Sequence, residues 1–358
     1  MNIGLLVDPY GEKSPGGLGR SIFEMTKAIL AADPGNTYTV YLKRQPPSPP
    51  ALPGSNWSLK VLGAKYLWLT GAWGMRRDLD AYIFFTPVTP LFFRPKKAIV
   101  VALDFAYLDI PATSARGRVG AWLLRRLHGR SLRLATRVVA ISEQTKADVV
   151  RHFGVSADKI DVVYIGYVAP VSVPRAMDVP TPFFLFAGVL KERKNVAGVI
   201  RAFAQSNSTH THHLLIAGKG GGTYEQLLRE LVQSLGLAPR VHFLGYVRDD
   251  ELAYLYHTAT ALVFPSYIEG FGMPVLEAMS VGLPVITSNQ GALAEVAGDA
   301  ALLVDPHDPS SIARAMDALA TDDALCTALR TKGLVRAHQF SWEACAEQLC
   351  ALVRTITI

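Results

Sequence analysis

Short apolar runs alternate with amphipathic stretches along the whole chain. Apolar runs bounded by turn residues predict buried strands, and the stretches between them have the periodicity of helices. In the first half the expected strands are residues 1–8, 37–43, 82–85, 98–103, 137–141 and 160–165. In the second half they are residues 183–188, 214–217, 241–244, 261–265 and 283–287. This alternation predicts an α/β protein with two doubly wound, Rossmann-like parallel sheets.

A proline-bearing segment separates the two series of strands. Ala169–Pro182 holds four prolines and little apolar periodicity, which predicts a linker. The expected organisation is a first domain over residues 1–170, a linker over 171–182, a second domain over 183–340, and a C-terminal helix over 341–358. Ligands of such sheets bind outside the carboxyl ends of the strands, so two facing sheets predict a cleft between the domains.

Composition favours a globular protein of the cytoplasm. Half of the 358 residues are hydrophobic and 18% are charged, which is enough for two cores. The first eight residues are typical of a strand rather than of a signal peptide. The longest apolar run, Ala98–Leu103, is too short to cross a bilayer. The three cysteines have neither disulfide nor metal-ligand spacing, which favours a reducing compartment.

Positive charge is concentrated in the first half of the chain. Residues 1–170 hold 22 lysines and arginines against 12 acidic residues, a net charge of +10. Within residues 113–137 there are seven arginines and no acidic residue. This pattern is typical of a basic amphipathic helix on an anionic membrane or acceptor, or of a solvated helix. The candidate acceptor or membrane residues are Arg116, Arg118, Trp122, Arg125, Arg126 and Arg130. No nucleic-acid-binding motif is present, so nucleic acid is not an expected partner.

Two glutamates stand eight residues apart in the sequence EGFGMPVLEAM. Glu269 is expected on a loop and Glu277 about one turn inside a helix that has proline in its first turn. The amides of residues 272–275 would then lie between the two carboxylates and attract phosphate. Gly270 would let a ligand approach the backbone. A nucleotide sugar offers hydroxyls and a diphosphate together, although a loop glutamate and an ordinary helix glutamate would have the same spacing.

Further polar loops follow other strands of the second half. Lys191, Arg193 and Lys194 follow residues 183–188 and could neutralise a diphosphate without a metal, or form a solvated turn. The glycine run 218–222 fits neither the Walker nor the GxGxxG pattern, which disfavours a dinucleotide-dependent dehydrogenase. Three histidines, at positions 210, 212 and 213, alternate on what is expected to be a polar surface loop rather than a metal site.

Several motifs resemble those of one enzyme family. They are GGLGR (16–20), VVAISEQTK (138–146), GVLKERKN (188–195), LLIAGKGG (214–221), RVHFLGYV (240–247), LVFPSYIEGFGMPVLEAMSVGLPVITSN (262–289), GDAALLVDP (298–306) and FSW (340–342). Together they resemble the family-4 retaining glycosyltransferases of the GT-B fold, and the mannosyltransferase-type members in particular. The resemblance is strongest over residues 183–342.

The resemblance implies a role for each matching position. Glu269 would contact the donor sugar and Glu277 the ribose, while Arg193 and Lys194 would stabilise the departing diphosphate. The remaining donor-binding positions would be Gly17, Leu18, Gly188, Gly218, Val247, Gly270, Phe271, Gly272, Met273, Pro274 and Val275. The family needs no metal or other cofactor, and its C-terminal helix crosses back to the first domain.

Two positions depart from the family pattern. Many relatives carry a histidine where Leu103 stands, directly before Asp104. Asp104 is therefore a candidate for orienting the acceptor, or a buried structural aspartate. Some relatives have arginine where Val189 stands, which leaves Arg193 and Lys194 to supply the charge.

The resemblance thus implies a retaining, metal-independent hexosyltransferase, expected in the cytoplasm or at the inner face of the membrane. GDP-mannose is the favoured donor and a UDP-sugar the alternative. The first domain would bind the acceptor, for example a lipid-linked oligosaccharide in surface polysaccharide biosynthesis, and the second domain the donor. The alternatives are a soluble natural-product acceptor, a non-catalytic sugar-nucleotide-binding scaffold, and an epimerase of the same fold.

Overall fold

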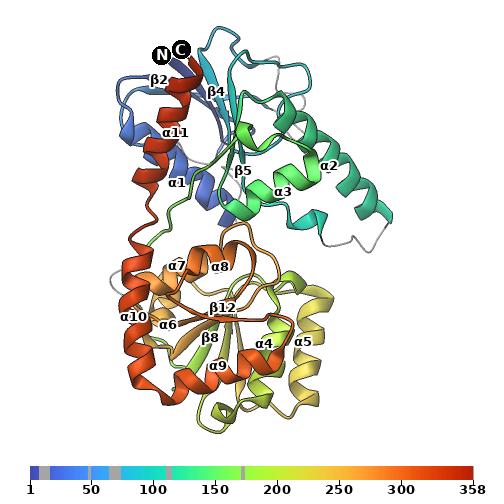
Figure 1. The fold of residues 1–358 in the computed structure, drawn as a ribbon, viewed down its shortest axis with the longest axis vertical. Coiled ribbons are helices and arrows are strands. Elements are labelled where there is room, and N and C mark those ends of the chain that lie inside the picture. Colours follow the sequence, from blue (N-terminus) through green and yellow to red (C-terminus); the bar gives the residue numbers. More distant parts are fainter. Residues whose placement is uncertain (8–16, 47–49, 64–73, 110–114, 171–173, 358) are drawn as a thin grey trace. The chain divides into compact units, whose positions relative to one another are not determined.

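The computed structural model describes residues 1–7, 17–46, 50–63, 74–109, 115–170 and 174–357 (Figure 1). The chain forms two compact units. The N-terminal unit consists of residues 1–166 together with 340–358, and the C-terminal unit of residues 167–339. The boundary between the two units therefore lies directly after Gly166, a few residues before the expected linker.

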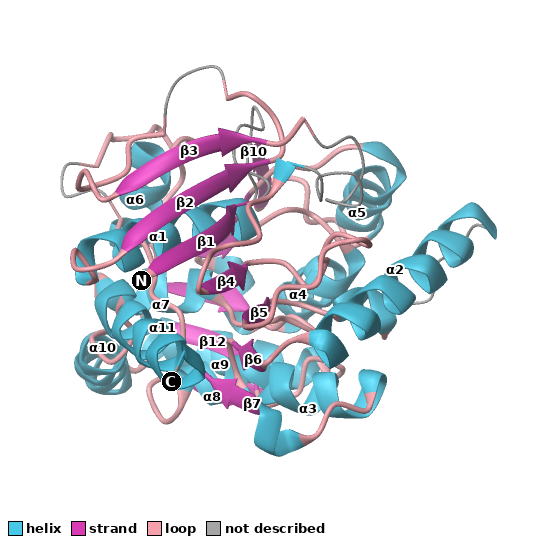
Figure 2. Ribbon diagram, turned by 90° about the horizontal axis from the view of Figure 1, so that it is seen from above, coloured by secondary structure: helices cyan, strands magenta, loops and turns pink. Residues whose placement is uncertain are grey.

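The N-terminal unit is built on a seven-stranded parallel sheet, whose strands are seen in order in Figure 2. From edge to edge the strands are β3 (Trp57–Val61), β2 (Thr37–Leu42), β1 (Asn2–Val7), β4 (Ala81–Phe84), β5 (Ala98–Ala102), β6 (Arg137–Ala140) and β7 (Ile160–Val162). Its helices are α1 (Gly17–Ala32), η2 (Ala106–Leu108), α2 (Ala115–Leu134), α3 (Glu143–Phe153) and η3 (Ala157–Lys159). The strand order, with β1 between β2 and β4, is that of a doubly wound sheet.

The central strands of this sheet are apolar because both of their faces are covered. Every residue of β4 and β5 is buried, as expected for strands with helices on both sides. Helix α3 begins where Ser142 accepts a hydrogen bond from the Thr145 N–H and ends at Gly154, which has a φ of 65°. The strand predicted over residues 137–141 is confirmed as β6, and α3 follows it directly.

The C-terminal unit repeats this plan with a six-stranded parallel sheet. Its order is β10 (Val241–Gly245), β9 (His213–Ala217), β8 (Phe183–Ala187), β11 (Ala261–Phe264), β12 (Val285–Ser288) and β13 (Leu302–Val304). Its helices are η4 (Glu192–Lys194), α4 (Val196–Gln205), η5 (Asn207–His210), α5 (Gly222–Ser234), α6 (Asp249–Thr258), α7 (Met273–Ser280), α8 (Gly291–Ala297), α9 (Pro309–Thr321) and α10 (Asp323–Ala337).

The last helix, α11 (Trp342–Thr357), belongs to the N-terminal unit. It packs along α1 and buries Cys345, Leu349 and Cys350 there. The start of α11 passes close to Gly166, where a Cβ would lie 2.5 Å from the Trp342 backbone nitrogen. A glycine at position 166 thus lets the end of the chain return to this unit.

Two edge strands and one histidine-bearing segment differ from the sequence prediction. Strands β3 and β13 were not predicted, and both are edge strands. The histidines at 210–213 do not form a surface loop, because His212 is buried against Phe184 and His213 begins β9. His213 Nδ1 lies 3.0 Å from His242 Nε2. A guanidinium can donate but not accept, so Arg240 Nη1 donates to His213 Nε2 at 3.2 Å. The ring proton of His213 is therefore on Nδ1 and is directed to His242.

Candidate functional site

Loops that follow β8, β9 and β11 meet at the carboxyl edge of the C-terminal sheet. The Tyr267 N–H donates to the Arg193 carbonyl at 2.9 Å, which joins the loops after β8 and β11. The Leu190 N–H donates to the Lys219 carbonyl at 3.0 Å, which joins the loops after β8 and β9. Ligands of doubly wound sheets bind at this edge. The loops are therefore positioned to act on one ligand.

Glu269 is the centre of a buried ionic cluster in these loops. Its Oε2 lies 2.9 Å from Arg193 Nη1 and its Oε1 lies 2.7 Å from Lys194 Nζ. Only 8% of the glutamate side chain is exposed. Burial raises the pKa of Glu269, but the charges of Lys194 and Arg193 outweigh this effect and hold the pKa below its usual value. Glu269 is consequently a carboxylate at neutral pH.

Both cations of the cluster are also fixed by other contacts. Arg193 Nη1 donates to the Ile268 carbonyl at 2.8 Å. Lys194 Nζ lies 4.6 Å from the centre of the Phe264 ring, a cation–π contact. The cluster of two cations and one carboxylate has a net charge of +1. Its position and sign suit an anionic group bound next to Glu269.

Glycines bring the backbones of the β8 and β9 loops into direct contact. A Cβ at Gly218 would lie 1.9 Å from the Gly188 carbonyl oxygen, so no other residue fits at position 218 without a backbone shift. Gly188 and Gly218 have φ values of 153° and 155°, which also favour glycine. The Gly218 N–H donates to the Gly245 carbonyl at 2.7 Å. A ligand above these loops would meet backbone rather than side chains.

Helix α7 begins next to this cluster. Gly272 caps it with a φ of 106°, and a Cβ there would lie 2.5 Å from Leu293 Cδ2. Pro274 is in the first turn and has no N–H, while the Val275 N–H donates to the Gly272 carbonyl. The expectation that all amides of residues 272–275 would be available to a ligand is therefore wrong. The remaining positions of this segment are half-buried at Gly270 and Met273 and buried at Phe271.

Glu277 lies on α7, as predicted, and receives a hydrogen bond from α6. Tyr256 Oη donates to Glu277 Oε2 at 3.0 Å, and Tyr256 is buried. Val247, half-buried, lies between β10 and α6. No local sequence signal marks Tyr256 as a site residue, because its bond joins two helices distant in sequence. Tyr256 orients the second glutamate of the pair.

Asn195 is a second residue of the site that sequence analysis left without a role. Its Nδ2 donates to the carbonyls of Pro265 at 3.1 Å and Pro306 at 2.6 Å. It has a left-handed φ of 56° and is buried. Gly198 makes room for it, since a Cβ there would lie 2.1 Å from Asn195 Oδ1. Asparagine tolerates this backbone conformation better than most residues, which was an available sequence signal.

The remaining predicted residues belong to the N-terminal unit. Gly17 and Leu18 form the exposed first turn of α1, and the residues directly before them lie outside the described part of the chain. Asp104 follows β5, and its Oδ1 accepts the Ala106 N–H at 2.6 Å. Leu103, at the position where many relatives have histidine, is buried. This bond stabilises the start of η2, and Asp104 is half-buried rather than buried.

Helix α2 carries the predicted basic residues and exposes apolar side chains between them. Val119, Trp122 and Leu123 are 66%, 58% and 50% exposed, which is unusual for large apolar residues on one helix face. The Arg126 guanidinium stacks on Trp122, 5.1 Å from the ring centre. A cavity of about 350 Å³ beside the helix is lined by Trp122, Arg125, Arg126, Gly129, Arg133, His152 and Phe153.

The predicted arginines of α2 do not all have the same surroundings. Arg118 is exposed, and Arg125 is exposed with a contact to the His152 carbonyl at 3.3 Å. Arg130 is half-buried and donates to Thr89 Oγ1 at 3.1 Å and the Leu91 carbonyl at 2.8 Å, so it holds a loop in place. Arg116 is in the first turn, but its side chain lies outside the described part. Of the predicted arginines whose side chains are described, Arg118, Arg125 and Arg126 are therefore the exposed ones.

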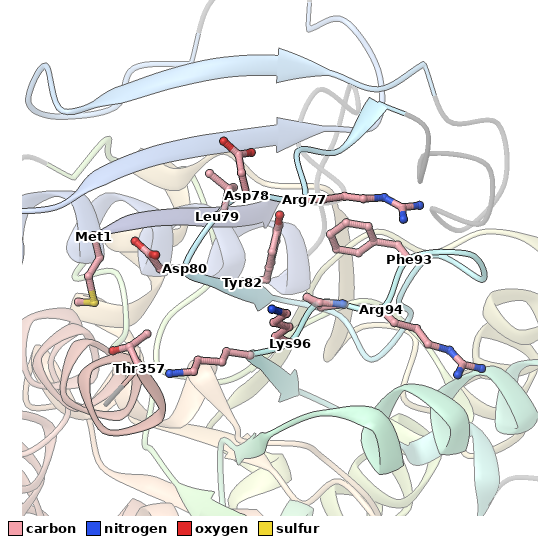
Figure 3. A pocket seen from close by; sticks show the side chains of 12 residues that line it. Met1, Arg77, Asp78, Leu79, Asp80, Tyr82, Phe93, Arg94, Lys96 and Thr357 are labelled. Atoms are coloured by element: carbon pink, nitrogen blue, oxygen red, sulfur yellow. The ribbon is translucent and has the colours of Figure 1, made fainter.

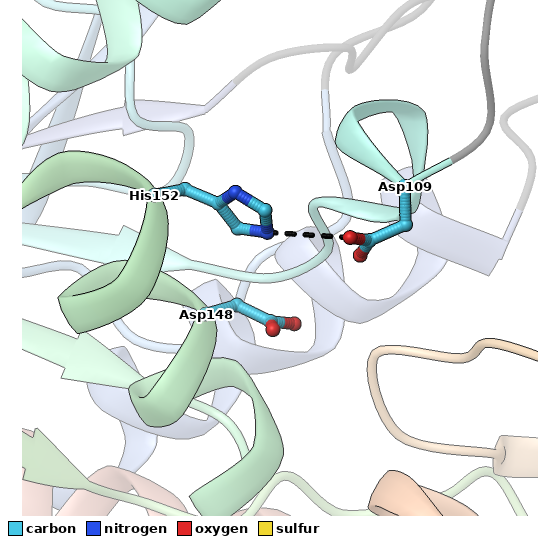
Figure 4. A group of neighbouring side chains, drawn as sticks. All are labelled: Asp109, Asp148 and His152. Atoms are coloured by element: carbon cyan, nitrogen blue, oxygen red, sulfur yellow. Dashed lines mark ion pairs between the residues drawn. The ribbon is translucent and has the colours of Figure 1, made fainter.

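Within the described residues, one group has the composition of a metal site. Asp109, Asp148 and His152 of the N-terminal unit place their ligand atoms within 4.8 Å of one another (Figure 4). His152 Nε2 lies 3.4 Å from Asp109 Oδ1, and Arg151 Nη2 lies 2.9 Å from that oxygen and 3.2 Å from Asp148 Oδ1. Because the Arg151 guanidinium already supplies the positive charge, an ion-pair network explains the group.

Known protein families match both halves of the chain. Residues 15–168 match the family model described as Glycosyltransferase Family 4, and residues 174–335 match the one described as Glycosyl transferases group 1. O-antigen chain mannosyltransferase B of Escherichia coli is 32% identical over 289 residues, which cover 77% of this chain and 75% of that protein.

Solved structures of glycosyltransferases share the fold. Sucrose-phosphate synthase from Thermosynechococcus elongatus superposes with a TM-score of 0.78 at 23% identity, covering 99% of this chain and 98% of the other. HepE of Anabaena, in complex with UDP-glucose, gives a TM-score of 0.73 at 18% identity, covering 99% of this chain and all of the other. At these identities the likeness concerns the GT-B fold alone.

Proposed function

The chain belongs to glycosyltransferase family 4, and from this premise we propose that it transfers mannose from GDP-mannose to a glycan hydroxyl with retention of configuration. The observation that carries the proposal is the buried cluster of Glu269, Arg193 and Lys194 beside the glycine loops. We assign donor binding to the C-terminal unit and acceptor binding to the N-terminal unit. A metal or other cofactor has no role in this proposal.

Arg193 and Lys194 would stabilise the departing diphosphate. Cleavage of the bond between sugar and phosphate develops negative charge on the leaving oxygen, and fixed cations nearby lower the barrier. The leaving oxygen would take the proton of the acceptor hydroxyl as the new bond forms on the same face of the sugar. Both cations now contact Glu269, so the bound diphosphate would compete with that carboxylate for them.

Glu269 would act as a hydrogen-bond acceptor for sugar hydroxyls rather than as an acid or base. The lowered pKa of Glu269, held by its two cations, keeps it unprotonated across the neutral range. Glu277, oriented by Tyr256, would accept hydrogen bonds from the ribose diol. Gly188 and Gly218 would let the nucleotide lie on backbone, and Asp104 would orient the acceptor from the other unit.

The choice of mannose rests on O-antigen chain mannosyltransferase B of Escherichia coli, a relative whose match covers 77% of this chain. That name also supports a growing surface polysaccharide as acceptor. A UDP-sugar is the alternative donor, as for HepE, whose structure holds UDP-glucose.

The exposed face of α2 would contact an anionic membrane that carries a lipid-linked acceptor. Its arginines complement lipid phosphates, and Val119, Trp122 and Leu123 would enter the headgroup region. No helix in the described ranges is long and apolar enough to span a bilayer. The chain would therefore lie at the membrane surface.

Nucleotide-dependent thermal stability tests the donor assignment. GDP, UDP, ADP and TDP are compared on the parent, on Glu277→Ala, and on Glu230→Ala, which removes an exposed carboxylate of α5 as a control. A nucleotide at 100 times its Kd stabilises the native state by about 2.7 kcal/mol, a shift of several degrees. We expect a shift with GDP that is lost only in Glu277→Ala. A shift with UDP alone would mean that the donor is a UDP-sugar and not GDP-mannose. No shift with any nucleotide would contradict the proposal.

Transfer from labelled GDP-mannose to a mannose-terminated oligosaccharide tests catalysis. We expect turnover in EDTA, an axial new linkage, and a roughly 100-fold lower kcat in Lys194→Met, since one stabilising group is lost. Nucleotide binding without any transfer would favour the non-catalytic scaffold, and dependence on added divalent metal would contradict the metal-free mechanism.

A further inference from the structure

A second concave site lies in the N-terminal unit at the amino edge of its sheet. It has a volume of about 630 Å³, within the range of small-molecule sites. Its walls come from residues 77–82 before and within β4, residues 93–97 before β5, Met1, and Thr357 at the end of α11 (Figure 3). We call it the amino-edge pocket. Segments far apart in sequence thus form one cavity.

Four cations line the amino-edge pocket: Arg77, Arg94, Lys96 and Lys97. None of them has a hydrogen-bonded or ion-paired side-chain partner among the residues that the structure describes. The charge of Arg94 also affects the pKa of a neighbouring arginine, Arg130. Together with burial, which is the larger effect, that charge lowers the pKa of Arg130. The four cations therefore form no ion pair within the described part of the chain.

The two carboxylates of the pocket are already engaged elsewhere. Asp78 accepts two hydrogen bonds from Arg76, at 3.0 Å from Nε and 2.6 Å from Nη2. Asp80 Oδ2 accepts the Asn2 N–H at 2.7 Å. Asp78 is neutralised by Arg76, but a neutral N–H leaves the charge of Asp80 in place, so the four lining cations and Asp80 together give the pocket a net charge of +3. An anionic ligand would supply the missing charge.

The amino-edge pocket is separate from the carboxyl edge where Asp104 and Gly17 lie. The lining segments precede β4 and β5, whereas Asp104 follows β5. A strand of four or five residues spans about 13–17 Å at 3.3 Å per residue. One small ligand cannot reach both edges of the sheet.

We propose that the amino-edge pocket binds a phosphate-bearing ligand of sugar-phosphate size. Guanidinium groups pair with phosphate oxygens through two parallel hydrogen bonds, and lysines add point charges, so two residues of each kind suit phosphate. The volume exceeds that of phosphate alone and accommodates an attached sugar. The site is distinct from the donor site and does not depend on the proposed reaction.

Amide chemical-shift mapping locates such binding. Pyrophosphate and glucose 1-phosphate are titrated into the ¹⁵N-labelled full chain, with glucose as the uncharged comparison. The pocket variant is Lys96→Gln with Lys97→Gln. The control variant is Arg44→Gln with Arg175→Gln, two exposed positions outside both sites that remove the same charge.

We expect saturable shifts at residues 77–82 and 93–98 with both phosphate compounds and none there with glucose. The Kd read from these amides should rise at least tenfold in the pocket variant and stay unchanged in the control. Shifts confined to the loops at 188–195 and 218–221 would overturn the proposal, because they would place the only phosphate site at the glutamate cluster. Equal affinity in both variants would overturn it as well.

Discussion

The side chain of Asn195 ties together loops from three strands of the C-terminal sheet. It follows β8 and η4, and its amide donates to the carbonyls of Pro265 after β11 and Pro306 after β13. These bonds are buried, so neither carbonyl can turn to water instead. Lys194 precedes Asn195 directly, which makes the position of this cation depend on the asparagine.

Asn195→Ala should therefore both destabilise the C-terminal unit and lower the catalytic rate. Two buried acceptors lose their donor, and alanine is strained at the left-handed φ, so we expect a loss of about 2–4 kcal/mol in the free energy of unfolding. Urea unfolding measures it. Asn207→Ala, which removes an exposed amide bonded to Asp317 at 3.3 Å, should change stability by less than about 0.5 kcal/mol. Equal effects of the two substitutions would contradict the tying role.

The hydroxyl of Tyr256 acts on the ligand through Glu277 rather than by contact. Tyr256→Phe keeps the buried ring and removes the 3.0 Å hydrogen bond to the carboxylate. A hydrogen bond to a charged group contributes about 1.5–3 kcal/mol, so nucleotide affinity should fall roughly tenfold or more, provided that Glu277 holds the ribose. Isothermal titration with GDP measures it.

Tyr254→Phe, on the same helix, is the matched control and should leave GDP affinity unchanged. If Tyr256→Phe lowers the melting temperature but not the affinity, the bond serves packing alone. In that case Glu277 would not be the ribose ligand.

At the level of elements, α2 has a buried face and an exposed face of opposite character. Its inner face places His128 against Phe105, Tyr107 and Phe153, with His128 Nδ1 2.9 Å from the Tyr107 hydroxyl. Its outer face exposes Trp122 and the arginines. The inner face packs α2 against the rest of the N-terminal unit. The outer face is the one available to bind a partner.

The inner face should make the N-terminal unit sensitive to acid. Burial lowers the pKa of His128 from 6.5 to about 4, so between these values the unfolded chain takes up a proton that the folded chain does not. Stability contributed by neutral His128 is full above pH 6.5 and is lost as the pH falls toward 4. From pH 7 to pH 4.5 we expect a loss of about 2–3 kcal/mol. Hydrogen exchange of β6 amides measures it.

His128→Leu should remove that part of the pH dependence. His338→Leu, which replaces an exposed histidine of the other unit, should keep it. If the parent and His128→Leu have the same slope between pH 7 and 4.5, the histidine is not held neutral by its burial.

The outer face of α2 should bind anionic vesicles and not neutral ones. Each arginine near such a surface contributes about 1 kcal/mol, so replacing Arg118, Arg125 and Arg126 by glutamine should weaken binding to phosphatidylglycerol vesicles roughly 100-fold at low salt. Co-sedimentation measures it. The charge-matched control replaces Arg44, Arg175 and Arg314, which are exposed elsewhere. Equal losses in both variants would mean that net charge, not this helix face, governs binding.

For the molecule as a whole, the sequence predicted the core strands and the edge strands β7 and β10, but missed the edge strands β3 and β13. Buried strands such as β5 read as continuous apolar runs because both faces are covered. Strand β3 is half-exposed and alternates Trp57, Leu59 and Val61 with polar residues, a period-two signal that the preceding prolines obscured. Strand β13 has only three residues and pairs on one side. Short edge strands carry too few positions to define a period.

The glutamate cluster could be predicted only in part for a related reason. Glu269, Arg193 and Lys194 were recognisable because charged residues follow apolar strands, and parallel strands end at one edge of a sheet. Their pairing was not, since the sequence does not say that the cations contact the glutamate itself. Tyr256 and the amino-edge pocket depend on contacts between segments distant in sequence, for which local patterns carry no signal.

The division into two units predicts how a single core substitution spreads. Leu349 of α11 is fully buried and lies in the N-terminal unit although its neighbours in sequence, α9 and α10, lie in the other. Leu349→Ala should cost about 2–5 kcal/mol and raise hydrogen exchange in β1 and α1, with the C-terminal sheet protected as before. Leu319 of α9 is also buried, and Leu319→Ala should instead raise hydrogen exchange in β12 and β13 while the N-terminal sheet stays protected. Because each unit has its own core, the two exchange patterns should not overlap. If either substitution raised exchange in both sheets alike, the chain would unfold as one cooperative body, and the return of α11 would couple the two units rather than complete one of them.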